Sequence, residues 1–260
     1  MDGLPIQKSE VSDLKKSNIY LSTIDEKAHL LAKEHGLGIE IAEFCTPWYL
    51  DTELADIDPA VREKLACSDR FVMHGPFSEL FPCAIDPKVR EIAAERFRQV
   101  ISVARGYGIA KIVLHGGYNP RIYYPIWYTE QSVVFWKEFV QEIPENMVFC
   151  LENVFEETPD MLAEIIRQVD DPRIRMCLDV GHVNAYSKIS AMEWLDQCED
   201  LIAHVHVHNN DTSSDSHSQL WDGTVPMKQW LDNLEEKCPE ATVTLELMDA
   251  APSVRWLLED

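Results

Sequence analysis

Basic residues are scarce in this chain. Its 260 residues include 23 Lys and Arg against 45 Asp and Glu, which gives a formal net charge of −22. A protein that binds nucleic acid must neutralise phosphates, and no run of basic residues is present to do so. Solubility explains most of the acidity, but the balance argues against nucleic acid as a partner.

The sequence also lacks segments typical of membrane or secreted proteins. No apolar run approaches the ~18 residues needed to span a bilayer. The first ten residues, MDGLPIQKSE, contain no apolar stretch of the kind found in signal peptides. The seven cysteines are odd in number and include no CxxC pair, which favours reduced thiols over disulfides or a redox site. We therefore expect a cytoplasmic protein with no membrane partner.

Short apolar runs alternate with amphipathic stretches along the chain. Continuous runs of Val, Ile and Leu are typical of parallel strands buried on both faces. We expect strands at residues 18–22, 38–44, 70–74, 111–115, 147–153, 174–180, 202–208 and 242–247. We expect helices at 25–35, 87–105, 129–142, from 158–159 onward, and at 191–199, 227–236 and 251–258, with a broken helical crossover at 51–66. This alternation predicts the α/β class and a single (β/α)8 TIM barrel domain over residues 1–260.

Histidines and acids gather where the expected strands end. They are His74, His115, Glu152, Asp179, His182, His206, His208 and Glu246. In a barrel, the C-terminal ends of the strands carry the active site. Carboxylates that converge there, with Asp215 from a nearby loop, would repel one another unless a divalent cation lay between them. The pattern predicts a divalent-metal site on this face.

Each of these residues also has a plain structural interpretation. His74 and His115 could be hydrogen-bonded loop residues, Glu152 could bridge strands, and Asp179 could cap the next helix. What favours a site is the recurrence of the same placement on six different strands.

The remaining histidines differ in their expected roles. His204, His206 and His208 alternate and share one face of their strand, so we expect only one or two at the site and favour His206. His29 and His35 lie in a predicted helix and are expected to be structural.

The strings DVGHVNAY, HVHVHNND, DSH and TLEL resemble the xylose-isomerase-like TIM barrels, a superfamily of endonuclease IV, sugar isomerases and epimerases, and inosose dehydratases. The resemblance to the epimerases implies that one divalent ion is held by Glu152, Asp179, His206 and Glu246, and that His182 contacts substrate. The resemblance to the endonucleases implies three zinc ions held by His74, His115, Glu152, Asp179, His182, His206, Asp215, His217 and Glu246.

From this resemblance we expect a divalent-metal-dependent isomerase or epimerase of a small sugar or related polyol. Glu152 and Glu246 would be the catalytic residues and would move a proton through an enediolate intermediate. The alternatives are a zinc-dependent apurinic-site endonuclease, a metal-dependent dehydratase of a cyclic polyol of the inosose type, and a non-catalytic binding module. Mixed His and carboxylate ligands suit Mn, Zn, Co and Fe alike.

Several residues in the loops are candidates for substrate binding. Trp48, Trp221 and the aromatic segment 118–128 could pack against a sugar, or could pack the loops against the barrel rim. Arg121 is the best basic candidate for a phosphate or carboxylate contact. One arginine without a glycine-rich phosphate motif favours an unphosphorylated substrate. A homo-oligomer is compatible with the sequence, which does not fix the subunit count.

Overall fold

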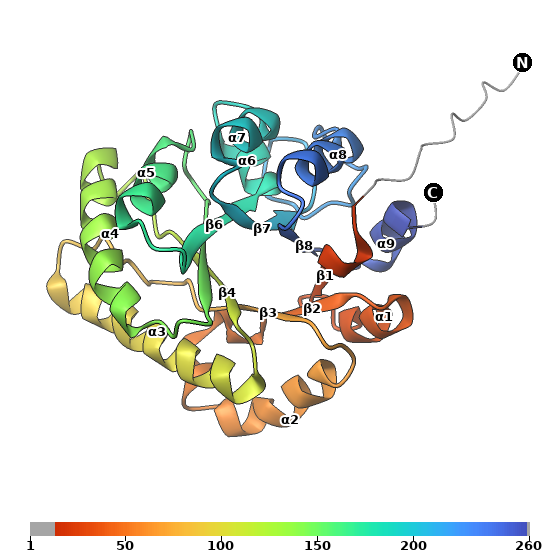
Figure 1. Ribbon diagram of the computed structural model, residues 1–260, viewed down its shortest axis with the longest axis horizontal. Coiled ribbons are helices and arrows are strands. Elements are labelled where there is room, and N and C mark those ends of the chain that lie inside the picture. The colour runs from red at the N-terminus through yellow and green to blue at the C-terminus, as the bar shows by residue number, and fades with distance from the viewer. Residues whose placement is uncertain (1–13, 259–260) are drawn as a thin grey trace, which may run out of the picture.

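The computed structural model describes residues 14–258. The segment MDGLPIQKSE and the outer ends of the predicted 1–260 domain lie outside these residues. Eight parallel strands close into one barrel in chain order, with helices around it (Figure 1). The strands are β1 (Ile19–Ser22), β2 (Gly38–Ile41), β3 (Phe71–His74), β4 (Lys111–His115), β5 (Val148–Glu152), β6 (Ile174–Asp179), β7 (Ile202–Val207) and β8 (Thr242–Leu245). The predicted TIM barrel is confirmed.

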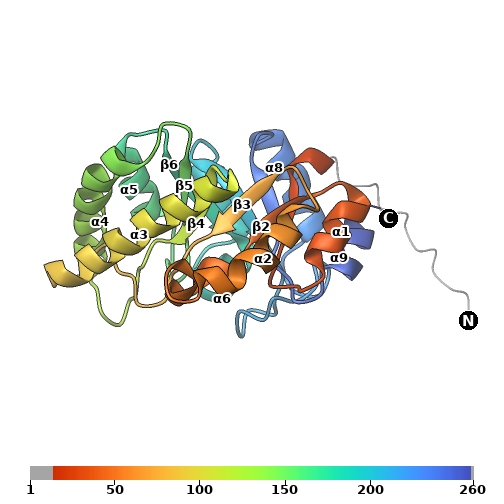
Figure 2. The same cartoon turned by 90° about the horizontal axis from the view of Figure 1, so that it is seen from below.

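The helices lie on the outside of the strands (Figure 2). They are α1 (Ala28–His35), α2 (Leu54–Leu65), α3 (Pro87–Tyr107), α4 (Pro125–Phe139), α5 (Asp160–Val169), α6 (Val180–Tyr186), α7 (Ala191–Cys198), α8 (Met227–Lys237) and α9 (Ala251–Leu258). Four 3-10 turns complete the elements: η1 (Lys16–Asn18), η2 (Glu43–Cys45), η3 (Pro47–Leu50) and η4 (Val140–Glu142). Among the described residues no helix is long and apolar enough to cross a membrane.

The apolar core is divided by the strands. The large cluster packs strands against helices, whereas a small one contains Tyr20, Val72, Val113, Cys150 and Cys177. Side chains two positions apart on a strand point to the same face, so Val113, Cys150 and Cys177 share the inner face with His115, Glu152 and Asp179. The barrel interior therefore holds this small apolar cluster beneath the polar side chains at the C-terminal ends of the strands.

Several predicted boundaries differ from the structure, by up to four residues. β2 ends at Ile41 rather than at residue 44, because the chain turns into η2. α4 begins at Pro125, four residues before its predicted start. Proline is common at the first position of a helix, because its missing N–H is not needed there. α5 begins at Asp160, just after the predicted start at 158–159, and the hydroxyl of Thr158 donates to the carboxylate of Asp160 instead of accepting from the backbone.

One helix was missed. α6 begins directly after the last residue of β6, with no loop between them. Asp179 caps it, since its Oδ1 accepts a hydrogen bond from the backbone N–H of His182 at 2.6 Å. The string DVGH is therefore both a strand end and a helix start.

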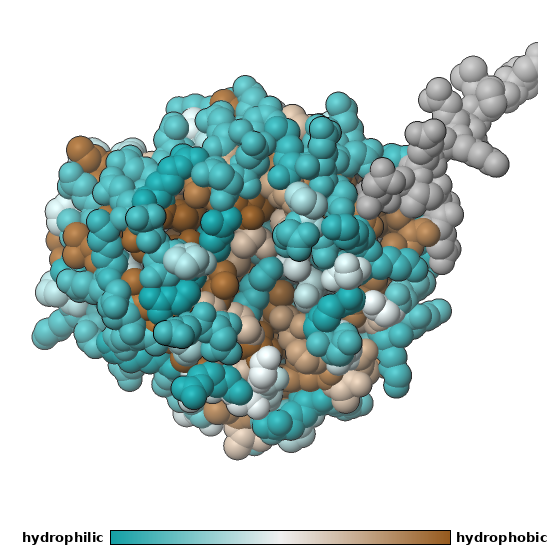
Figure 3. All heavy atoms as spheres, in the orientation of Figure 1, coloured by the Kyte–Doolittle hydropathy of each residue, from teal (hydrophilic) through white to brown (hydrophobic). Residues whose placement is uncertain are grey.

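Polar side chains dominate the face of the molecule seen in Figure 3, with small apolar patches between them. This surface agrees with the strongly acidic composition.

Candidate metal centre

The strand register brings the candidate residues to one edge of the barrel. His115 lies opposite Glu152 in the pairing of β4 with β5, and Asp179 lies opposite His206 in the pairing of β6 with β7. Glu246 directly follows β8. Neighbouring parallel strands end at the same edge, so these side chains meet at the C-terminal mouth.

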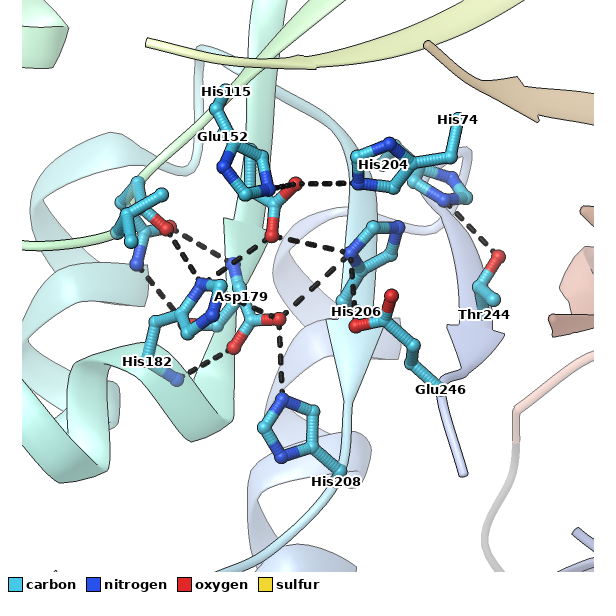
Figure 4. A network of polar contacts seen from close by, with 12 residues as sticks. His74, His115, Glu152, Asp179, His182, His204, His206, His208, Thr244 and Glu246 are labelled. Atoms are coloured by element: carbon cyan, nitrogen blue, oxygen red, sulfur yellow. Dashed lines mark hydrogen bonds and ion pairs between the residues drawn. The ribbon is translucent and has the colours of Figure 1, made fainter. Parts of the chain in front are cut away.

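At the centre of the cluster, the imidazole of His206 faces three carboxylates (Figure 4). Its Nδ1 lies 3.4 Å from Oε1 of Glu152, 3.8 Å from Oδ2 of Asp179 and 3.6 Å from Oε2 of Glu246. This Nδ1 is buried and has no hydrogen-bond partner among residues 14–258. The structure thus brings together the four side chains from which a mononuclear site was predicted.

A second group lies on one side of this centre. Oε2 of Glu152 is 3.2 Å from Nε2 of His74 and 3.4 Å from Nε2 of His115. The two oxygens of Glu152 therefore face different imidazoles, with Oε1 directed to His206. Glu152 joins the two groups.

A third group lies on the other side, around a loop carboxylate. Oδ2 of Asp215 is 3.2 Å from Nε2 of His182 and 3.3 Å from Nε2 of His217. His182 also connects to the centre, since its Nδ1 is 3.3 Å from Oε1 of Glu152. All nine candidate positions therefore form one connected cluster.

His208 belongs to this cluster as well, although the sequence favoured His206 in its place. Its Nε2 lies 3.2 Å from Oδ2 of Asp179, and its ring stacks on that of His217 at 3.9 Å between centroids. Its Nδ1 lies 3.6 Å from Oδ1 of Asp215, and neither atom has a hydrogen-bond partner within the described chain. Two of the three alternating histidines therefore meet the site.

Glu40 is a residue that the sequence analysis missed. It is fully buried on β2, where its two oxygens contact Nε2 of His206 and Nε2 of His204, each at 2.9 Å. The signal was present in the string GIEI, because a carboxylate between two isoleucines of an apolar run is rarely buried without partners.

Asp179 has two roles, one for each oxygen. Oδ1 caps α6, while Oδ2 faces His208 and His206. The cap is confirmed, while the role of Asp179 as a metal ligand stays a prediction. The cap also fixes the start of α6, and with it the position of His182, whose Nδ1 contacts the backbone oxygen of Asn153 at 2.9 Å.

Burial and mutual attraction shift the pKa values of the cluster in opposite directions. Burial alone would raise the pKa of Glu152, yet His115 and His206 bring that pKa well below its ordinary value. Burial alone would lower the pKa of His206, yet Cys177 and the surrounding carboxylates raise that pKa well above its ordinary value. Without a metal ion, the surrounding carboxylates therefore favour the protonated form of the His206 imidazole.

The two outer groups differ from each other. Burial lowers the pKa of His115 to about 3. For His217, the effect of burial is outweighed by Asp215 and Glu246, which raise its pKa to about 9. His115 is therefore a free imidazole at neutral pH, whereas His217 has to lose a proton to bind a cation.

The donor set fits a divalent ion. Carboxylate oxygens and imidazole nitrogens are ligands for Zn, Mn, Co and Fe(II). The unpartnered Nδ1 of His206, in the middle of three carboxylates, is the atom whose surroundings are explained best by a cation. Glu152, Asp179 and Glu246, with an imidazole from β7, are the residues that could hold it.

Two aromatic side chains that the sequence analysis did not name lie beside the cluster. Phe77 stacks on His115 at 4.2 Å, and Tyr186 lies 6.3 Å from His182 between ring centroids. Both are partly exposed, so both could meet a substrate. Phe77 lies three residues after His74, which was a usable signal.

The role of Trp48, Trp221 and Arg121 in substrate binding stays a prediction, and among residues 14–258 their hydrogen bonds and ring contacts are with residues outside the cluster. Trp221 packs against Trp256 of α9 and borders a surface hollow of about 590 Å³ with residues of α8. Trp48 lies in η3, half exposed, edge-on to Tyr49. Arg121 is exposed, and within the described part of the chain only its backbone N–H forms a hydrogen bond, to Asn119.

Comparison with known proteins identifies the family. Residues 30–259 match the family described as xylose isomerase-like TIM barrel, and the chain belongs to it. A relative, the uncharacterized protein MJ1311 of Methanocaldococcus jannaschii, is 25% identical over 216 residues, which are 72% of this chain and 69% of the relative.

Solved structures share the fold at low identity. The TTHB071 protein from Thermus thermophilus, soaked with ZnCl2, has a TM-score of 0.73 and 22% identity, with 92% of this chain and 96% of that chain covered. A D-tagatose 3-epimerase-like protein has a TM-score of 0.71 and 21% identity, with 92% and 93% covered.

Proposed function

We propose that the protein is a divalent-metal-dependent isomerase or epimerase of a small sugar or related polyol. The observation that carries the proposal is the placement of Glu152 and Glu246, which approach the same nitrogen of His206 from different strands. Two carboxylates on either side of one centre suit the transfer of a proton between two positions of a substrate. The similarity to a D-tagatose 3-epimerase-like protein supports this class of reaction.

Glu152, Asp179 and Glu246, with His206 or His208 from β7, would hold the ion. When bound, a divalent ion supplies Lewis-acid polarisation of a substrate carbonyl. A histidine ligand from β7 must present an unprotonated nitrogen, and Nδ1 of His206 already faces the three carboxylates.

The two catalytic carboxylates differ in access to substrate. The side chain of Glu246 is 12% exposed and that of Glu152 only 1%. Glu246 is therefore the group that exchanges its proton with solvent more readily. Each carboxylate would remove or return a proton at a carbon beside the carbonyl, and His182 would donate a hydrogen bond to a substrate hydroxyl.

The surroundings of the site favour an unphosphorylated substrate. In the described part of the chain, the ion pairs of the cluster carboxylates are all with histidines, not with Lys or Arg. A phosphate group usually requires such a basic partner. The exposed face of Phe77 instead offers an apolar surface for the C–H face of a sugar.

The test is turnover in D2O. The metal-loaded protein is incubated with ketohexoses, ketopentoses and inososes, each with Mn2+, Co2+ or Zn2+, and products are analysed by NMR. We expect one sugar or polyol to be converted, with deuterium at the carbon that flanks the carbonyl. Conversion without deuterium would contradict proton transfer by a carboxylate. Loss of water from an inosose would move the assignment to a dehydratase.

One observation favours a second candidate, a zinc-dependent apurinic-site endonuclease. The groups His74–His115–Glu152 and His182–Asp215–His217 flank the centre, so three ions could lie side by side. The net charge of −22 disfavours a DNA substrate. Cleavage of an abasic duplex at low salt, with no sugar converted, would establish this activity and overturn the first proposal.

A further inference from the structure

A chain of hydrogen bonds runs through the barrel interior below the cluster. Nζ of Lys111, at the start of β4, donates to Oγ1 of Thr242 at 2.7 Å, and this oxygen lies 2.6 Å from Nδ1 of His204. Nε2 of His204 lies 2.9 Å from Oε2 of Glu40, whose Oε1 lies 2.9 Å from Nε2 of His206. Both imidazoles and the carboxylate are fully buried. The chain thus connects the opposite end of the strands to the metal centre.

Lys111 at one end and Glu40 at the other set the direction of the protons along these hydrogen bonds. An ammonium group only donates hydrogen bonds, so Oγ1 of Thr242 accepts from Lys111 and has one proton to give. This hydroxyl lies 2.6 Å from Nδ1 of His204 and 3.4 Å from the backbone oxygen of Ala203. Because the carboxylate of Glu40 accepts, His204 carries its proton on Nε2 and donates to Glu40, and its Nδ1 accepts from Thr242. The reverse arrangement would press a lone pair of His204 against a buried carboxylate.

Glu40 is therefore surrounded by donors. Its Oε2 accepts from His204 and from the hydroxyl of Thr244, and its Oε1 accepts from Nε2 of His206. With a hydrogen on Nε2 of His206, Nδ1 is the nitrogen that faces the cluster.

We propose that Glu40 is a positioning residue that fixes the ring of His206 with Nδ1 directed at Glu152, Asp179 and Glu246. This inference rests on the proposed function only in taking the cluster as a metal centre. Glu40 lies behind His206 and acts through it. Outer partners of this kind commonly change metal affinity by about 10–100-fold when they are replaced.

Glu40→Gln tests the role with little change in shape. The amide offers one acceptor and one donor in place of two acceptors. Whichever way it turns, its NH2 group meets the Nε2–H of either His204 or His206, and one imidazole must reorient. We expect Mn2+ and Zn2+ affinity, measured by competition with a chelator, to fall about 10–100-fold. A folded Glu40→Gln protein with wild-type affinity would overturn the proposal.

Val113→Ala is the matched control. Val113 lies in the small apolar cluster inside the same barrel and is not one of the residues of the hydrogen-bond chain from Lys111 to His206. This variant should lower the unfolding midpoint and keep the metal affinity. An equal loss of affinity in Val113→Ala at a similar midpoint would show that Glu40 acts only through general stability, and would overturn the positioning role.

NMR of histidine ring nitrogens gives a second measurement that needs no variant. In the wild-type protein, Nε2–H of His206 should be a protected, downfield proton without metal, and should persist when Zn2+ binds through Nδ1. Its disappearance on Zn2+ binding would overturn the proposal. If wild type binds neither metal, the proposed function fails, while the presence or absence of this protected proton still decides the role of Glu40.

Discussion

Nδ1 of His206 and Oε1 of Glu152 lie 3.4 Å apart at the centre of the cluster. The same nitrogen faces Asp179 and Glu246 and has no hydrogen-bond partner among the residues described. A lone pair and three carboxylates cannot face one another without a proton or a cation between them. We therefore expect the stability of the protein to depend both on pH and on whether a cation is bound at this position.

Metal removal should lower stability. A ligand that binds only the folded state at 100 times its Kd adds about 2.7 kcal/mol to the free energy of unfolding. We expect chelator-treated protein to unfold at a lower temperature and Mn2+, Co2+ or Zn2+ to restore the midpoint. Metal analysis of the loaded protein then counts the ions, with one per chain expected for the isomerase. No shift with any of the three ions would contradict a metal centre.

Glu246→Gln should nearly abolish turnover. The amide can still bind a cation through oxygen, but it is a poor base, so kcat should fall about 10²–10⁴-fold while much of the metal stays bound. Turnover and metal content are measured on the same preparation. Glu236→Gln, an exposed change on α8, is the control and should behave as wild type. A Glu246→Gln enzyme within a few fold of wild-type kcat would remove Glu246 from the catalytic pair.

The metal-free protein should lose stability as the pH rises through about 9. Although burial opposes it, Asp215 and Glu246 raise the pKa of His217 from its ordinary value of 6.5 to about 9. A raised pKa stabilises the fold fully below about 6.5, and this contribution disappears as the pH passes 9. His217→Asn should flatten the pH dependence of the unfolding free energy between these values, measured by urea denaturation with chelator present. An unchanged slope would contradict the pairing of His217 with Asp215.

The fold could be predicted because its signals are local. Apolar runs and amphipathic stretches alternate along the chain, and each strand had a run of its own. The details that failed depend on tertiary context. α6 follows β6 without a loop, so no turn residues separate them, and the early end of β2 follows from η2 packing at the barrel mouth.

The candidate site was predicted only in part, because spacing along one strand does not give depth in the barrel. His204, His206 and His208 share a face, but only the structure shows that His204 lies below the cluster while the other two reach it. Glu40 was missed because site residues were sought only at the ends of predicted strands. The predicted strand ran to residue 44, which placed Glu40 in its middle, whereas β2 ends at Ile41, the next residue. For the loop residues Trp48 and Trp221, the sequence contains no periodic pattern from which the direction of the side chain could be predicted.

Gly181 supports the prediction that is most specific to this barrel. A Cβ at this position would lie 1.8 Å from Cε1 of His208, far inside contact distance. Gly181→Ala should therefore displace the imidazole from Asp179 and cost about 1–3 kcal/mol of unfolding free energy, as overpacking does. We also expect weaker metal binding, measured by chelator competition, because His208 would leave the cluster.

Gly106→Ala separates this effect from glycine replacement in general. Gly106 lies on the exposed side of α3, and a Cβ there would meet nothing within 4 Å. Gly106 is the next-to-last residue of α3, where alanine gains less than in a helix interior, so this variant should be as stable as wild type or slightly more stable, with unchanged metal affinity. If Gly181→Ala also kept wild-type affinity while showing the expected destabilisation, the metal would not depend on His208, and His206 alone would supply the imidazole from β7.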